Sequence, residues 1–192
     1  MIRTENFAQV AIESLDDLRA WLSHNHDSRD SVWIVRYQKS VPEKFVDRLD
    51  MLDELLCWGW VDGLARKLDD KRTMQLISRR RQQAWSQTYK DRVEHLMATG
   101  RMAAPGLAAI AQSQAMGLWD AYAEVDLLEV PADLRVALDA NPDAAVFFDA
   151  AARSYRRNVL RWIHAAKRPE TRVARVARIV ETAARGDKLP QL

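Results

Sequence analysis

The chain has 192 residues, of which 48% are hydrophobic and 29% are charged, so it can bury the core of one large domain or of two small ones. It contains no apolar run that is typical of a membrane span or a signal peptide, which makes the cytoplasm the expected compartment. One cysteine and four dispersed histidines exclude an internal disulfide and the usual zinc-ligand spacings, and neither a metal nor a cofactor is predicted.

The net charge of +2 hides four blocks of alternating sign. Residues 1–70 carry 9 basic and 14 acidic side chains, whereas residues 71–118 carry 8 and 2. Residues 119–150 carry 1 and 8, and residues 151–192 carry 11 and 3. The blocks could pair within the fold, or the basic blocks could form a surface for an anionic partner. Internal pairing is favoured, because opposite charges on one compact chain neutralise one another without a partner.

Caps, turns and apolar spacing divide the first part of the chain into helices and strands. A β-branched or aromatic run favours a strand, and a polar cap before leucines at helical spacing favours a helix start. Three strands, the last two joined by a tight turn, predict a small mixed or antiparallel three-stranded sheet with helices on one face. The predicted elements are a helix from Ser14 to Asn25, a strand over 32–37, a helix from Asp50 to Gly59, and a hairpin of 60–68 and 72–77.

After the hairpin the pattern is typical of successive helices. Helix starts are expected at Pro131, at Asn141 followed by Pro142, at Ser154 and at Pro169. The last two of these helices have an apolar stripe opposite several arginines, so the C-terminal part is predicted to be a helical bundle with a basic exterior.

The predicted fold class is therefore α+β, with the sheet in the N-terminal half and the bundle in the C-terminal half. Residues 1–118 form the expected α+β region and residues 119–192 the helical region, although the two could pack as one globular unit. The acidic stretch from Asp120 to Asp133 is the candidate connection between them.

The segment from Cys57 to Gly63 combines a thiol, two indoles, a carboxylate and two glycines at a helix-to-strand junction. Indoles offer stacking surfaces and a donor, and Asp62 could bind a polar ligand or orient Arg66. The alternative is that both tryptophans belong to the core and that Asp62 begins a turn or bulge. Cys57 follows two leucines on an apolar helix face, which favours a buried, inert thiol.

The run from Arg79 to Trp85 places several guanidiniums before the next helix. Guanidiniums and a helix N-terminus both favour an anion, and Trp85 could stack on a base. The alternative, which is favoured, is a solvated basic loop that the acidic segments neutralise.

Six runs of the sequence form a recognisable set: Leu55–Gly63, Lys67–Arg72, Arg79 with Trp85-Ser86, Gly100–Leu107, Tyr155–Arg157, and Trp162-Ile163 with Ala166–Arg172. This set resembles the bacteriocin-protection, YdeI/OmpD-associated proteins of bacteria, and the resemblance extends from about Ser14 to about Lys188. It implies an association with bacteriocin or antimicrobial-peptide tolerance and with an outer-membrane porin. It implies no defined reaction and no established catalytic residues.

The sequence departs from the pattern of that family in two places. Gln75–Arg79 stands where similar proteins have an arginine, an aromatic residue, threonine and proline before the arginine. Tyr89 stands where an asparagine is usual. Ligand contacts that the family makes through those residues are not transferred to this chain.

The first function hypothesis is a non-enzymatic binding or stress-tolerance protein. Its hairpin should bring Asp62 and Arg66 near Arg79 and Trp85, around a pocket for a small anionic ligand or a peptide. No catalytic residue is predicted. The predicted ligand-binding residues are Trp58, Trp60, Asp62, Arg66, Arg79, Arg81 and Trp85.

Two alternatives belong to other classes. An enzyme of unfamiliar type could use Asp62 with Arg66 or Arg79, which requires the carboxylate to lie in a cleft. Nucleic-acid binding is disfavoured by the near-neutral charge and by the absence of a recognised motif. Its candidate residues are Arg153, Arg156, Arg157, Arg161, Arg175 and Arg178 on the C-terminal helices.

Overall fold

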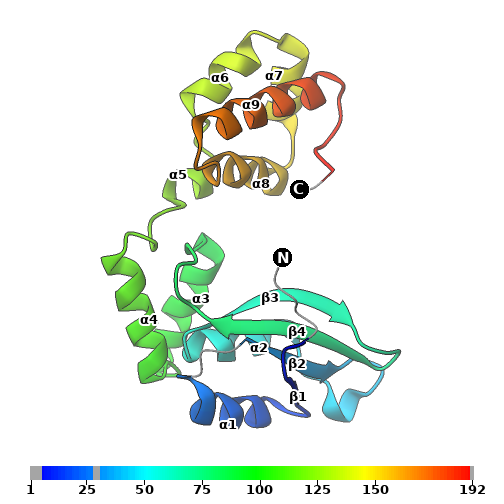
Figure 1. The fold of residues 1–192 in the computed structure, drawn as a ribbon, viewed down its shortest axis with the longest axis vertical. Coiled ribbons are helices and arrows are strands. Elements are labelled where there is room, and N and C mark those ends of the chain that lie inside the picture. The colour runs from blue at the N-terminus through cyan, green and yellow to red at the C-terminus, as the bar shows by residue number, and fades with distance from the viewer. Residues whose placement is uncertain (1–5, 28–30, 191–192) are drawn as a thin grey trace. The chain divides into compact units, whose positions relative to one another are not determined.

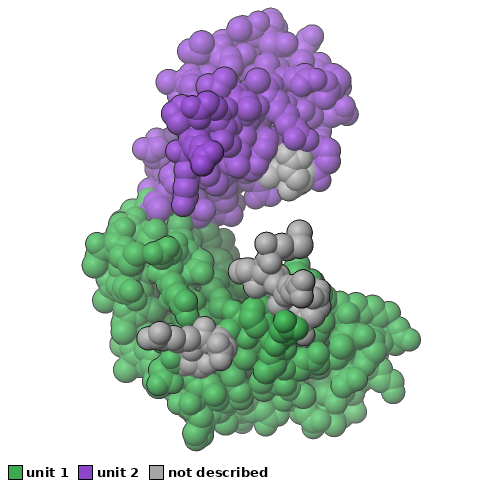
Figure 2. Space-filling model, in the orientation of Figure 1, with its two compact units in different colours: residues 1–120 green, residues 121–192 purple. Residues whose placement is uncertain are grey.

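The computed structural model describes residues 6–27 and 31–190. It divides into two compact units, residues 1–120 and residues 121–192 (Figure 2). Residues 1–5, which bear on the expected absence of a signal peptide, lie outside the described residues. The α+β class predicted from the sequence is confirmed, because the first unit contains a sheet and the described part of the second is helical.

The first unit is built on a four-stranded mixed sheet in the order β1-β2-β4-β3 (Figure 1). Strand β1 is parallel to β2, and β4 is antiparallel to β2 and β3. The sequence predicts three strands; β1 is missed because three residues carry too little periodicity. The elements are β1 (Gln9–Ala11), α1 (Leu15–Asn25), β2 (Val32–Tyr37), a 3-10 turn (Pro42–Lys44), α2 (Arg48–Cys57), β3 (Trp60–Lys67), β4 (Arg72–Arg79), α3 (Gln87–Ala98) and α4 (Ala104–Ala115).

Side-chain caps determine where the first two helices begin. Ser14 caps α1 as predicted, since its hydroxyl accepts a hydrogen bond from the backbone N–H of Asp17. Helix α2 begins earlier than predicted, because the carboxylate of Asp47 accepts from the N–H of Leu49 at 2.7 Å. Asp50 lies instead in the first turn, where the helix dipole favours a negative charge.

Helices α1 and α2 cover one face of the sheet and form the main core of this unit (Figure 1). Leu18 and Leu22 of α1 pack there with Met51 and Leu55 of α2 and with Trp60 of β3. A second cluster lies between α2, α3 and α4. It contains Leu52, Leu56, Cys57, Trp85, Val93, Leu96 and Ile110. The C-terminal end of α2 therefore belongs to both clusters and joins the sheet to α4.

The second unit contains five helices among its described residues, packed around one apolar cluster. Asn141 caps a helix whose first residue is Pro142, as predicted, and Pro169 begins the last helix. The prediction that Ser154 caps a helix is wrong: that helix begins at Arg153 without a side-chain cap. The helices are α5 (Ala123–Asp126), α6 (Ala132–Asp139), α7 (Pro142–Ala150), α8 (Arg153–His164) and α9 (Pro169–Ala184).

The acidic and basic blocks of the second unit pair with one another. Arg157 and Arg161 of α8 lie 3.4 and 3.1 Å from Asp126, whose side chain is only 9% exposed. Arg172 of α9 donates two hydrogen bonds to the carboxylate of Asp133. Internal pairing therefore accounts for part of the alternating charge. Among the described residues, no helix combines the length and apolarity that crossing a membrane requires.

Candidate functional site

Two glycines allow α4 to pack directly on the junction between α2 and β3. Gly59 has φ +73°, and a Cβ there would lie 2.9 Å from the Cβ of Ala109 and from the carbonyl oxygen of Pro105. A Cβ on Gly106 would lie 2.2 Å from the carbonyl oxygen of Cys57. Larger residues cannot occupy either position without moving backbone. The helix therefore lies against the base of the β3–β4 hairpin.

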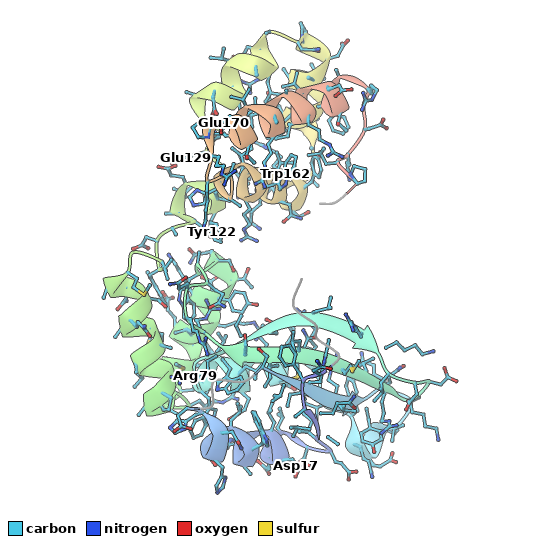
Figure 3. The ribbon with its side chains drawn as sticks, in the orientation of Figure 1. Asp17, Arg79, Tyr122, Glu129, Trp162 and Glu170 are labelled. Atoms are coloured by element: carbon cyan, nitrogen blue, oxygen red, sulfur yellow. The ribbon has the colours of Figure 1, made fainter. Side chains whose placement is uncertain are left out.

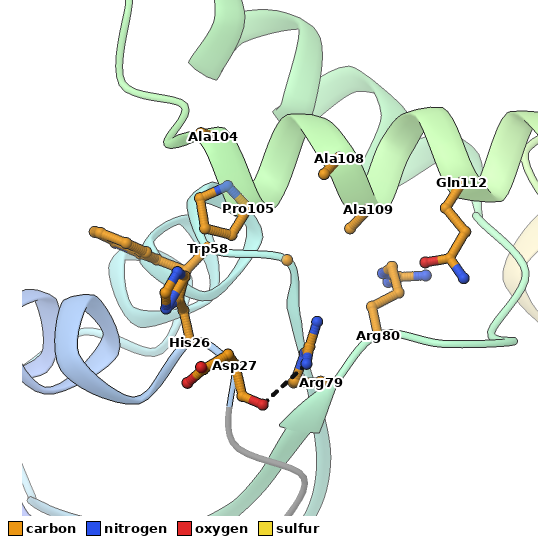
Figure 4. Close-up of a pocket in the computed structure, with 11 residues that line it drawn as sticks. His26, Asp27, Trp58, Arg79, Arg80, Ala104, Pro105, Ala108, Ala109 and Gln112 are labelled. Carbon is orange, nitrogen blue, oxygen red and sulfur yellow. Dashed lines mark hydrogen bonds between the residues drawn. The ribbon is translucent and has the colours of Figure 1, made fainter.

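A pocket of about 400 Å³ lies where α4 faces this hairpin base (Figure 4). One wall is the first two turns of α4, the opposite side is the end of β4, and the end of α1 and the α2–β3 junction complete it. The lining residues are His26, Asp27, Trp58, Gly59, Arg79, Arg80, Ala104, Pro105, Ala108, Ala109 and Gln112.

Arg80 is the most buried charged group of the pocket, with only 5% of the residue exposed. Its guanidinium carbon lies 3.9 Å from the ring centroid of Trp85, and its backbone N–H donates to the carbonyl of Gly59. One terminal nitrogen donates to the carbonyl of Gln83, whereas the buried Nε has no hydrogen-bond partner among the described residues. Burial lowers the pKa of Arg80 to about 10, so the guanidinium stays charged at neutral pH.

Other buried charges of this unit are paired, which makes Arg80 an exception. The Glu54 carboxylate, 3% exposed, lies 3.0 Å from Arg19 and 3.4 Å from Arg101. The ammonium of Lys90 lies 2.9 Å from Asp120. No described carboxylate lies at ion-pair distance from Arg80, although Asp62 acts on its charge from farther away. A buried charge without a close ion-pair partner is costly, so this guanidinium is pre-organised for an anion that enters the pocket.

Arg79 and Trp58 line the same pocket. Arg79 lies at the end of β4 (Figure 3). One of its terminal nitrogens donates to the backbone carbonyl of Asp27 at 3.0 Å (Figure 4). The indole nitrogen of Trp58 donates to Glu54, and the ring of His26 meets the Trp58 ring edge-on at 5.8 Å. Arg79 is exposed, so its guanidinium can reorient toward a ligand beside Arg80.

Asp62 lies outside the pocket, and both of its oxygens are engaged. The Tyr89 hydroxyl donates to one oxygen at 2.6 Å, and Arg48 lies 3.3 Å from the other. Burial, together with the hydrogen bond to Asp62, raises the pKa of Tyr89 to about 12. Tyr89 thus fixes the orientation of this carboxylate.

Two families match consecutive parts of the chain. Residues 10–109 match a family described as a domain of unknown function (DUF8412), which covers just over half of the sequence. The chain belongs to the DUF8412 family. Residues 127–186 match the family described as bacteriocin-protection, YdeI or OmpD-associated, which confirms that resemblance for the C-terminal part. Searches of the curated proteins and of the solved structures found no match.

Residues 10–109 contain every predicted ligand-binding residue and all of the pocket lining except Gln112. Trp58 and Arg79 line the pocket. Trp85 is 1% exposed, and its ring packs against the guanidinium of Arg80. Trp60 is fully buried in the main core, where its ring meets Trp21 edge-on. Arg81 is exposed and outside the pocket.

The expected approach of Arg66 to Arg79 is wrong. Arg66 pairs with Met74 in the hairpin, whereas Arg79 pairs with Trp60. Arg79 lies five positions after Met74 on extended β4, which is about 17 Å at the usual strand rise. The Arg66 guanidinium lies instead over the ring of Trp33.

The residues of the DUF8412 domain that sequence reasoning missed are Arg80, Gly59 and the pocket wall on α4. Arg80 stands between two arginines that were singled out, and only the fold shows which of the three is buried. The wall on α4 could have been recognised more easily from the sequence, since Ala104–Ala115 contains no charged residue. Cys57 is buried, as predicted, and burial raises the pKa of its thiol to about 11.

Proposed function

We propose that this protein is a non-enzymatic binding protein whose DUF8412 domain takes a small anionic ligand in the pocket beside Arg80. One observation carries the proposal: Arg80, only 5% exposed, lines a pocket of about 400 Å³ and has no acidic partner at ion-pair distance among the described residues. An anion that binds there supplies a counter-charge at ion-pair distance. The second guanidinium, Arg79, adds attraction at the same opening.

The local backbone supports an anion at this place. The first turn of α4 begins at Ala104 and forms part of the pocket wall, and the N-terminus of a helix carries partial positive charge. Asp27 is the acidic residue of the lining, and it offers its backbone carbonyl to Arg79. The pocket therefore presents more positive than negative groups.

The second unit is the basis for proposing a role in tolerance of antimicrobial peptides. The family that matches residues 127–186 is described as bacteriocin-protection. We propose that the protein contributes to such tolerance in the bacterial cytoplasm, with the two units acting as separate domains. In that role, the pocket of the first unit would bind the anionic ligand on which the tolerance depends.

The two alternative functions receive less support. Asp62 is held by Tyr89 and Arg48 outside the pocket, so it lacks the cleft that an enzymatic carboxylate requires. Several arginines proposed to contact nucleic acid serve the second unit itself. Arg157 and Arg161 pair with Asp126, Arg156 lies over Phe148, and Arg175 donates to the carbonyl of Trp162.

Isothermal titration with inorganic phosphate at low ionic strength tests the proposal. We expect saturable binding with a dissociation constant on the order of 1 mM, typical of a small ion with few contacts. Arg80→Gln should weaken binding by about tenfold or more, and Arg80→Lys by less, because it keeps the charge but loses the planar fork. Arg79→Gln provides a second test at an exposed position whose loss leaves the core intact.

Arg66→Gln is the matched control, because it removes one positive charge from the same unit, outside the pocket. It should leave the dissociation constant within about twofold of the wild-type value. Equal losses in Arg66→Gln and Arg79→Gln would mean that phosphate responds to net charge alone. That result, or no binding to the wild type, would refute the proposed function.

A further inference from the structure

The wall that α4 contributes to the pocket is apolar along its first two turns. Ala104, Pro105, Ala108 and Ala109 line the pocket, and a polar lining residue of this helix, Gln112, follows one turn later. Ala104 and Ala108 are exposed, although exposed helix positions usually carry polar side chains. At the rise of an α-helix, the apolar wall from Ala104 to Ala109 extends over about 7.5 Å. A bare anion would contact only part of this wall.

The volume of the pocket supports the same conclusion. A phosphate ion displaces about two waters, or about 60 Å³ at the volume of liquid water. The pocket holds about 400 Å³, within the range of pockets that take small organic molecules. A ligand that fills it must carry more atoms than its anionic group.

The Arg80 guanidinium and the aromatic rings lie at different ends of the pocket. Arg80 and Gln112 lie at one end, whereas Trp58 and His26 lie at the other, near Pro105 and with Asp27 beside His26 (Figure 4). The aromatic end offers the half-buried Trp58 ring, with the His26 ring edge-on beside it. Flat apolar groups pack well on such rings and on small side chains, because both allow close approach.

We propose, on the basis of the proposed function, that the ligand is an amphipathic anion. Its carboxylate or phosphate group binds Arg80 and Arg79, and its flat apolar body lies along the alanines of α4 toward Trp58. The buried guanidinium of Arg80 binds the anionic group of the ligand, and the apolar wall of α4 favours a ligand with a flat apolar body. The pocket thereby distinguishes such a ligand from inorganic anions, which lack an apolar body.

A series of three probes tests this proposal by isothermal titration: acetate, 2-naphthoate and 2-naphthylmethanol. The first shares only the carboxylate and the third shares only the ring system with 2-naphthoate. We expect 2-naphthoate to bind at least about tenfold more tightly than acetate, because it buries apolar surface against α4 and Trp58. The uncharged alcohol should bind at least about tenfold more weakly than 2-naphthoate, because it leaves Arg80 without a counter-charge.

Substitutions on α4 locate the apolar part of the ligand. Ala108→Gln introduces a long polar side chain on the pocket wall at an exposed position and should weaken 2-naphthoate about tenfold while leaving acetate unchanged. Ala111→Gln is the matched control, since Ala111 is exposed on the same helix but does not line the pocket. Arg80→Gln and Arg79→Gln should weaken both anions.

The outcomes separate this inference from the proposed function. If acetate and phosphate bind through Arg80 but 2-naphthoate binds no more tightly than acetate, the amphipathic ligand is refuted and the anion site stands. If 2-naphthoate and its alcohol bind equally well and neither responds to Arg80→Gln, the pocket is apolar only, and both proposals fail. Equal effects of Ala108→Gln and Ala111→Gln would place the apolar body elsewhere and overturn the inference.

Discussion

Arg80 of the first unit lacks the close acidic partner that several arginines of the second unit have. In the second unit, Arg157 and Arg161 share the buried carboxylate of Asp126, and Arg172 binds Asp133. In the first unit, the more deeply buried Arg80 has aromatic neighbours and a carbonyl but no ion-pair partner among the described residues. Both belong to basic blocks of the sequence. The difference makes Arg80, rather than its basic block as a whole, the centre of the candidate site.

The largest effect should come from removing the close packing that forms the pocket in the first unit. Gly106→Ala places a Cβ 2.2 Å from the carbonyl oxygen of Cys57, so α4 must move away from the α2–β3 junction. We expect the free energy of unfolding to fall by about 3 kcal/mol, as in strongly overpacked sites. Urea denaturation followed by circular dichroism measures this loss.

Gly63→Ala is the control for that substitution, because its Cβ would make an ordinary contact at 3.5 Å with the carbonyl oxygen of Leu76. Its effect should stay below about 1 kcal/mol. If both variants unfolded alike, the close approach of α4 would not be what supports the pocket.

A smaller effect is expected from breaking the internal pairing of the second unit. Asp126→Asn removes the charge that Arg157 and Arg161 share, at a side chain only 9% exposed. We expect a loss of about 2 kcal/mol, less than for a fully buried pair because both arginines are 31% exposed. Thermal unfolding measures it, with Asp187→Asn as an exposed control that should change little. If Asp126→Asn left the midpoint temperature of unfolding unchanged, internal pairing would not stabilise the second unit, and its arginines would no longer differ from Arg80 in this respect.

The smallest effect concerns pH and the carboxylate beside the pocket. The pKa of Tyr89 is raised to about 12, above its ordinary value of about 10, so its contribution to stability is full below pH 10. That contribution is lost as the pH rises through 12. A phenolate absorbance titration should show one tyrosine that ionises late, and Tyr89→Phe should remove it. A wild-type titration complete by pH 11 would contradict the burial of this phenol.

Local signals made much of the fold predictable from the sequence. The strand Val32–Tyr37, the Ser14 cap and the Asn141-Pro142 helix start depend on a few neighbouring residues, and the structure has all three. Where two caps compete, as Asp47 and Asp50 do before α2, local preference alone cannot choose. Strand β1 pairs with β2, and a run of three residues has too little pattern to predict this pairing.

The candidate site was less predictable, because it depends on distant packing. Sequence reasoning identified Arg79 and Trp58, but Trp60 of the same motif lies in the core. Arg80 is buried by the ring of Trp85 and by α4 on the other side of the pocket. Helix α4 begins more than twenty residues after Arg80 in the chain. No local pattern distinguishes Arg80 from its two neighbours.

The most direct test of the central claim follows the side-chain Nε–H resonances of the arginines by nuclear magnetic resonance while inorganic phosphate is added. The resonance of Arg80, assigned by its disappearance in Arg80→Lys, should shift saturably, because Arg80 lines the pocket and has no carboxylate at ion-pair distance among the described residues. The Nε of Arg161 also lacks a hydrogen-bond partner, but its guanidinium is paired with Asp126, so its resonance should stay in place. An unmoved Arg80 resonance, with shifts confined to the second unit, would contradict the account.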